Sequence, residues 1–75
     1  MQYKQLTDEC KPSEGKNHLM VAKFPDGEEA YWIVGRMLED GVTYKVTPFH
    51  FLNTADPQWQ EQGAVFYWAE IPRVS

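Results

Sequence analysis

The side chains that could bind a metal ion through sulfur or nitrogen are those of Cys10, His18 and His50. A structural zinc site takes four ligands, usually supplied as two closely spaced pairs. These three residues lie far apart in the sequence, and no CxxC or HxxxH pair is present. We therefore expect one unpaired thiol, two ordinary histidines and no metal site.

Covalent and acid–base catalysis have only weak candidates. Cys10 and His50 could form a dyad across the fold, but Cys10 sits in a polar stretch, TDECKPSEGKN, that is poorly suited to holding a nucleophile in place. Glu70 has apolar neighbours on both sides, but a single acid near a strand end is usually solvated. No GxGxxG or GxxxxGK phosphate loop is present. The sequence therefore predicts no enzyme and no cofactor; a small hydrolase using Cys10 or Glu70 is the third alternative for the function.

Aromatic residues are the clearest excess, with three Trp, four Tyr and four Phe among 75 residues. Such rings fill a small core efficiently, and Trp and Tyr are also enriched at protein interfaces. Proteins that bind single-stranded nucleic acid alternate such rings with Lys and Arg, whereas acidic residues lie near Trp32 and Trp68 here. The candidate protein-binding residues are therefore Trp68, Phe66, Glu70, Trp32 and Trp59.

The segment AVFYWAEIP, residues 64–72, concentrates this excess in one expected strand. Side chains alternate between the two faces of a strand. We interpret the face with the smaller apolar side chains as the core face: Val65, Tyr67, Ala69 and Ile71. The other face joins two rings to a carboxylate and is expected to be partly open at the carboxylate end: Phe66, Trp68 and Glu70. We expect segment 56–62 to cover Phe66 with Trp59, and we leave Trp68 open between core and interface.

The elements that position these residues begin with three strands joined by tight turns. Runs rich in aromatic and β-branched residues are typical of strands, and Asp-Gly pairs are typical of the turns between them. The pattern predicts an antiparallel meander over residues 18–48, built from HLMVAKF, EEAYWIVGRML and VTYKV with turns at PDG and EDG. Residues 28–39 also satisfy a helical spacing, but the consecutive bulky residues and Gly35 favour a strand. Gly35 is expected at a bulge or a close backbone approach.

The remaining segments complete one small domain. Residues 1–17 are expected to form an N-terminal segment and a loop, and residues 49–63 a connection in which FHFLN resumes the strand interrupted at Pro48. TADPQWQEQG could hold one helical turn, capped by Thr54 or Asp56 with Pro57 in the first turn. Residues 64–72 form the last strand. We predict a mostly-β domain, an antiparallel sheet of four or five strands, curled or backed by a short helix.

Composition narrows the class of partner and the compartment. The net charge is −4, and the seven Lys and Arg are scattered, which argues against nucleic acid as the partner. A single cysteine allows no internal disulfide, and MQYKQLTDECK does not resemble a secretion signal. No apolar run approaches the ~20 residues that span a bilayer. These features predict a cytoplasmic protein, of a bacterium or a phage-infected cell, that does not bind a membrane.

The order of motifs resembles a family of short phage and prophage proteins of unknown function. Its members carry an LP…G loop, a VLV-like strand, an aromatic central strand and a closing strand reading V-T-H-W-M-P-L-P. The matching pieces here are Leu6, Pro12 and Gly15, then LMVAKF, YWIVGR and VFYWAEIP. Tyr67 replaces the usual His, and Ala69-Glu70 replaces Met-Pro. The resemblance implies a mobile-element accessory gene and carries no catalytic residues.

The aromatic excess, the acidic balance and this resemblance together favour one functional hypothesis. We expect a non-enzymatic phage or prophage protein that binds a host or phage protein and inhibits or modulates it. A nucleic-acid-associated regulator is the second alternative. A homodimer is also open, because an uncovered apolar sheet face can be buried by a second copy.

Overall fold

A computed structural model describes residues 2–12, 16–46 and 50–71, in one six-stranded antiparallel sheet with one short helix. The sheet order is β1-β6-β2-β3-β4-β5. The elements are β1 (Lys4–Gln5), β2 (His18–Lys23), β3 (Glu29–Met37), β4 (Thr43–Val46), β5 (His50–Asn53), α1 (Pro57–Glu61) and β6 (Val65–Glu70). The predicted mostly-β fold is confirmed. The sheet has one strand more than expected, because the N-terminal segment adds a two-residue strand to the edge of β6.

The predicted meander is confirmed as β2, β3 and β4, each antiparallel to the next. The bulky run of β3 pairs along the whole of β2, from Lys23 opposite Glu29 to His18 opposite Val34, so the helical alternative is wrong. The register of β3 against β4 shifts between Val34 and Met37, which places the expected bulge at Gly35. Pro48, expected to interrupt the strand, lies outside the described residues.

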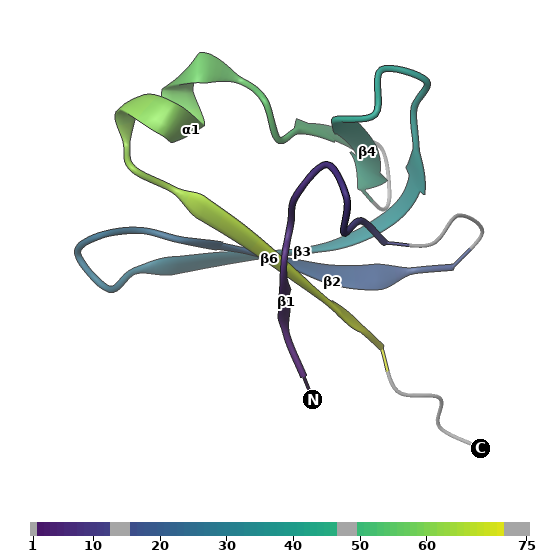
Figure 1. Ribbon diagram of the computed structural model, residues 1–75, viewed down its shortest axis with the longest axis horizontal. Helices are drawn as coiled ribbons and strands as arrows, with labels where there is room; N and C mark the ends of the chain where they lie inside the picture. The colour runs from purple at the N-terminus through teal and green to yellow at the C-terminus, as the bar shows by residue number, and fades with distance from the viewer. Residues whose placement is uncertain (1, 13–15, 47–49, 72–75) are drawn as a thin grey trace.

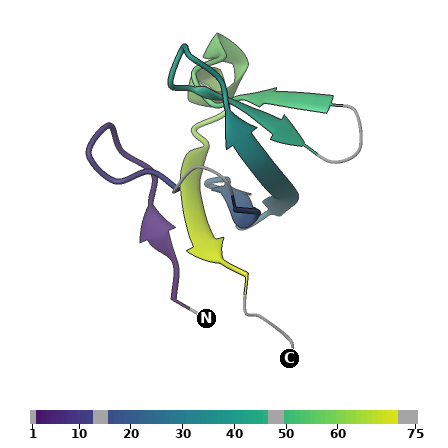
Figure 2. The ribbon, with the colours of Figure 1, turned by 90° about the vertical axis from the view of Figure 1, so that its right-hand side faces the viewer.

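The sheet is strongly curled, and the curl gives it two unlike faces (Figures 1 and 2). In Figure 1, β2, β3 and β6 are seen close to edge-on, and α1, β4 and β5 all lie on the same side of them. Figure 2 shows β1 beside β6, and α1 beyond the N-terminal end of β6, next to β4 and β5. We call the side that faces α1, β4 and β5 the inner face, and the opposite side of β1, β6, β2 and β3 the outer face.

The core fills the inner face. Its buried members come from five strands: Met20, Ala22, Val34, Tyr44, Val46, Leu52, Phe66 and Trp68. The interpretation that Val65, Tyr67, Ala69 and Ile71 form the core face of the last strand is therefore wrong. Phe66 and Trp68 are 8% and 5% exposed, whereas Val65 and Ile71 are 38% and 39% exposed. The reason is the curl, because the concave side encloses a volume that large rings fill better than small aliphatic side chains do.

The short helix α1 forms where the connection was expected to turn. Asp56 is the N-cap, and its side chain accepts a hydrogen bond from the Gln58 backbone N–H. Pro57 occupies the first turn, where a missing N–H costs nothing. A helix of five residues is too short to be stable alone, so it depends on Trp59, which packs against the core. Within the described residues, no helix is long and apolar enough to cross a membrane.

Candidate functional site: the outer face of the sheet

Three of the predicted binding residues meet in an aromatic cluster on the inner face. The ring centroids of Trp59 lie 5.5 Å from Phe66 and 5.7 Å from Trp32, both edge-on, and those of Trp32 and Phe66 lie 6.2 Å apart. Phe24 completes the cluster at 6.3 Å from Trp59. The expected cover of Phe66 by Trp59 is confirmed. These rings hold α1 against the sheet, and Trp32 and Trp59 are half-buried.

Trp68, left open by the sequence, lies in the core. Its indole N–H donates to the Cys10 carbonyl oxygen at 3.2 Å, and its ring packs edge-on against His18 at 5.4 Å. The Lys4 ammonium lies 5.0 Å from the ring centroid. Glu70, at the end of the same strand, is exposed as expected. A role for these residues in protein binding stays a prediction, but in this fold the buried rings offer a partner little surface.

The residues considered for catalysis and metal binding are not assembled into a site. The half-buried Cys10 packs against the core, and its backbone hydrogen-bonds to Thr7 and to the Trp68 indole. The buried ring of His18 lies with Nδ1 3.1 Å from the Lys16 carbonyl oxygen, while His50 is exposed on β5. Over the described ranges, no three His, Cys, Asp or Glu residues come together in a way that could hold a metal ion.

The outer face carries most of the exposed apolar surface. Alternation sends the odd-numbered residues of β2 and β6, and those of β3 before its bulge, to this side, with the start of the chain beside them. Large side chains that stay exposed here are those of Tyr3 (45%), Tyr31 (54%), Ile33 (49%), Val65 (38%) and Ile71 (39%). Between them lie the half-buried Leu19 and Tyr67 and the buried Val21 and Ala69, so that the residues of this face are apolar from strand to strand.

The strand pairing fixes the geometry of this face. Val21 lies between Tyr31 and Tyr67, its direct neighbours on β3 and β6, and is 1% exposed. Leu19 lies in the same way between Ile33 and Ala69. The larger side chains thus cover Val21, and they form most of the surface that this part of the face offers.

One end of the outer face carries charge of both signs. Lys23 on β2 and Glu29 on β3 are direct cross-strand partners. The Lys23 ammonium lies 5.2 Å from the Tyr67 ring centroid, and the Tyr31 hydroxyl donates to Glu29 at 2.9 Å. This hydrogen bond raises the pKa of the Tyr31 phenol, and the negative charge of Glu29 adds to the effect. The phenol therefore remains a neutral donor throughout the physiological range.

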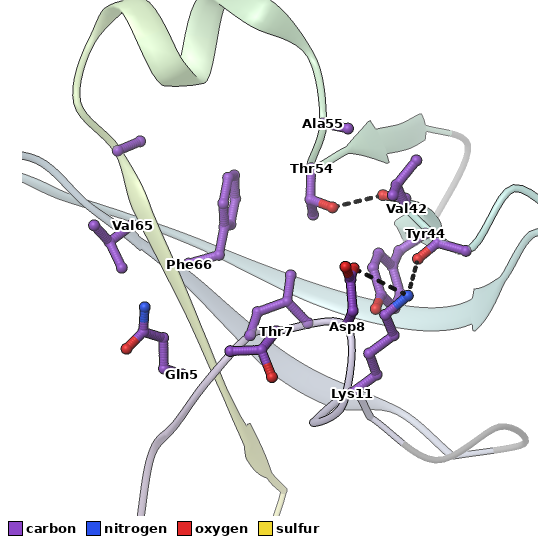
Figure 3. A pocket seen from close by; sticks show the side chains of 13 residues that line it. Gln5, Thr7, Asp8, Lys11, Val42, Tyr44, Thr54, Ala55, Val65 and Phe66 are labelled. Atoms are coloured by element: carbon purple, nitrogen blue, oxygen red, sulfur yellow. Dashed lines mark hydrogen bonds and ion pairs between the residues drawn. The ribbon is translucent and has the colours of Figure 1, made fainter.

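A pocket of about 390 Å³ lies on the other side of the sheet, between the N-terminal segment, the turn before β4 and the start of β6 (Figure 3). Phe66 and Tyr44 line it from β6 and β4. The Lys11 ammonium donates to the Gly41 carbonyl oxygen at 2.9 Å and lies 4.0 Å from the carboxylate of Asp8. Lys11 thus links two loops across the pocket, and its ammonium group is already in contact with oxygen atoms of Gly41 and Asp8.

Tyr44 lines this pocket with a hydroxyl that has no hydrogen-bond partner among the described residues. The residue is 1% exposed, and burial raises the pKa of its phenol. The hydroxyl oxygen itself is covered by protein. A ligand in the pocket would therefore meet the ring and the loop backbone rather than this oxygen.

The outer-face residues Tyr3, Tyr31 and Ile33 were missed by reasoning from the sequence. A usable signal lies in β3, where Tyr31 and Ile33 alternate with Trp32 and Val34. Both faces of that strand are apolar, so one of them must remain outside the small core. Choosing between them needs the direction of curl, which the sequence pattern does not contain.

Comparison with protein-family models finds no match for this chain, and comparisons with curated proteins and with solved structures find none either. The likeness to the phage and prophage proteins therefore stands on the short motifs quoted above.

Proposed function

We propose that this protein is a non-enzymatic binding module that uses its outer face to bind another protein. The motif resemblance supports a phage or prophage gene acting in the cytoplasm of its host, with a host or phage protein as the partner. Inhibition or modulation of that partner is the effect we propose.

The observation that carries the proposal is the apolar outer face. Soluble monomers rarely leave a large contiguous apolar patch uncovered, and such patches commonly mark interaction sites. Tyr31 and Ile33 remain about half exposed on β3 of this face although the chain is small and short of core material. Tyr is favoured at interfaces because it offers a large contact area with few rotatable bonds and a polar tip.

The chemistry of this face favours protein over nucleic acid. Lys23 on this face is paired across the strands with Glu29, and the exposed Arg36 on β3 adds a second, isolated cation. Affinity for nucleic acid comes largely from several cations that neutralise phosphates, and the chain as a whole carries a net charge of −4. An apolar, tyrosine-bearing surface with little net charge suits a protein surface of similar character.

The proposal is tested by affinity capture from a lysate of a bacterium that carries the gene, using matched variants. Ile33→Glu places a charge among the apolar residues of the outer face, where the side chain is 49% exposed and the fold can tolerate it. Phe51→Glu is the control, because Phe51 is 64% exposed on β5, which β3 and β4 separate from β2. We expect a protein captured by the wild type and by Phe51→Glu but not by Ile33→Glu.

Equal capture by all three proteins would contradict the use of the outer face. Capture of no protein by the wild type would contradict protein binding itself. Binding of a single-stranded oligonucleotide that weakens steeply with salt would instead support the nucleic-acid alternative.

A further inference from the structure

We infer that, when no other partner is bound, the outer face binds a second copy of this chain across a two-fold axis. The inference uses the surface of the proposed function but does not depend on the existence of another partner. A two-fold interface joins the same patch on both copies, so the patch must be complementary to itself. The outer face meets this requirement in its charges and in its apolar residues.

The charges of the face are self-complementary because opposite signs lie side by side. Lys23 and Glu29 are direct cross-strand partners at the same end of β2 and β3. An axis that runs parallel to these strands and midway between them places β2 of one copy over β3 of the other. Lys23 then faces Glu29 of the second copy, and Glu29 faces its Lys23. Two ion pairs of this kind form around a single axis.

The same axis also matches the apolar residues. Leu19 and Ile33 are cross-strand partners, as are Val21 and Tyr31. Rotation about the axis sets Leu19 over Ile33 of the second copy and Val21 over its Tyr31. The half-buried Leu19 thus meets the exposed Ile33 of the other copy, whereas Val21 is 1% exposed under its own neighbours and the contact beside it is made by the Tyr31 ring. Two sheets packed face to face in this way lie about 10 Å apart.

The size of the face sets the expected strength of the dimer. This axis sets β2 and β3 of each copy face to face, and two strands about 4.8 Å apart and about six residues long, at about 3.3 Å per residue, give a projected footprint of roughly 190 Å² per copy. Two such footprints fall below the roughly 1,200 Å² at which stable specific interfaces begin. The dimer is therefore weak and reversible, and its population changes with concentration in the micromolar range.

Analytical ultracentrifugation of the full chain from about 1 to 500 µM tests the inference. We expect the average mass of the wild type to rise with concentration from 8.8 kDa toward twice that value. Ile33→Glu is expected to stay at the monomer mass, and Phe51→Glu to follow the wild type. Circular dichroism of each variant at the lowest concentration shows that the monomer is folded.

Charge exchange tests the position of the axis. Lys23→Glu and Glu29→Lys each place like charges against one another across the axis, and each is expected to weaken the dimer at least tenfold. The double variant Lys23→Glu/Glu29→Lys restores opposite charges and is expected to recover most of the lost affinity. A double variant as weak as the single ones would overturn this arrangement.

A wild type that stays monomeric up to 500 µM, or an Ile33→Glu variant that dimerises as well as the wild type, would overturn the inference. Neither result bears on the proposed function. A monomeric wild type can still capture a protein from the lysate, and Ile33→Glu can still abolish that capture. A dimer sensitive to Ile33→Glu together with unchanged lysate capture would reject the proposed function and leave the dimer standing.

Discussion

Trp68 joins the core to the N-terminal segment through three different contacts. Its ring lies against His18, its N–H reaches the carbonyl oxygen of Cys10, and the Lys4 ammonium lies over it. The side chain is 5% exposed. Removing it would leave a large cavity and take one of two hydrogen bonds from the Cys10 carbonyl oxygen, which also accepts from the Thr7 backbone N–H at 3.1 Å.

We expect Trp68→Ala to lower the free energy of unfolding by about 3–5 kcal/mol, as for other large buried rings. Urea titration followed by circular dichroism measures the change. Val65→Ala on the same strand is the control and should cost less than about 1 kcal/mol, because Val65 lies on the outer face and is 38% exposed. Equal effects of the two changes would contradict the assignment of the faces.

Asp40 stabilises the turn between β3 and β4 in its charged form. Its carboxylate accepts hydrogen bonds from the Thr43 hydroxyl and from the backbone N–H groups of Val42 and Thr43. The Thr43 hydroxyl is the largest cause that lowers the pKa of Asp40 below its ordinary 3.8, followed by the two backbone donors. A lowered pKa means that this contribution is complete above pH 3.8 and is lost as the pH falls through the folded-state value.

Asp40→Asn should therefore lower stability at neutral pH and flatten the fall in stability below pH 3.8. Thermal unfolding between pH 7 and pH 2 measures both effects. Asp26→Asn is a matched control in the other acidic turn, where Asp26 accepts a single backbone hydrogen bond, from Glu28. An acid profile of Asp40→Asn that parallels the wild type would refute the role of this carboxylate.

At the scale of elements, two turn glycines share a strained backbone conformation but differ in the space around them. Gly27 and Gly63 both have positive φ, at 92° and 72°. A Cβ at Gly27 would meet nothing within 4 Å, whereas one at Gly63 would lie 2.8 Å from Cγ of Pro25. Gly63 links α1 to β6, and Pro25 belongs to the turn between β2 and β3, so the absence of a side chain at Gly63 lets the helix end approach that turn closely.

We expect Gly27→Ala to cost about 1 kcal/mol from the strained backbone alone. Gly63→Ala should cost more, because α1 or the Pro25 turn must also move. Chemical denaturation of the two variants side by side gives the difference. A Gly63→Ala variant no less stable than Gly27→Ala would show that the helix end does not rest on Pro25.

At the scale of the whole molecule, the N-terminal segment closes one edge of the sheet and covers part of the core. β1 pairs with β6 through Lys4 and Gln5 only, but Leu6 donates to the Phe66 carbonyl oxygen at 2.9 Å, and Lys11 reaches Gly41 across the pocket. Both Leu6 and Cys10 pack against the core. The segment after β1 therefore contributes more to stability than β1 itself.

Two truncations measure this difference. Removal of residues 1–5 should lower stability slightly, since it removes a two-residue ladder and the Lys4–Trp68 contact. Removal of residues 1–11 should lower stability much more and shift tryptophan fluorescence to the red, because Trp68 loses Cys10 and gains solvent. Equal stability of the two truncated chains would contradict this division of roles.

Much of the fold follows from local sequence pattern. The bulky β-branched runs and their Asp-Gly turns predict the β2–β3–β4 meander, since strand propensity and turn geometry act over a few neighbouring residues. The Asp56-Pro57 pair predicts the start of α1 for the same reason, through the side-chain cap and the fixed φ of proline. The irregularity near Gly35 was also predictable, because a glycine inside a strand often marks a bulge or a close approach of another backbone.

The sequence by itself determined that both faces of β3 and β6 are apolar, but only the tertiary structure decided which face became the core. Alternation states that Phe66 and Trp68 share one face and Val65 and Tyr67 the other, without saying which face is covered. The choice depends on the direction of curl and on α1, β4 and β5 closing over one side, which are contacts between distant segments. The candidate site is the face that this closure left open.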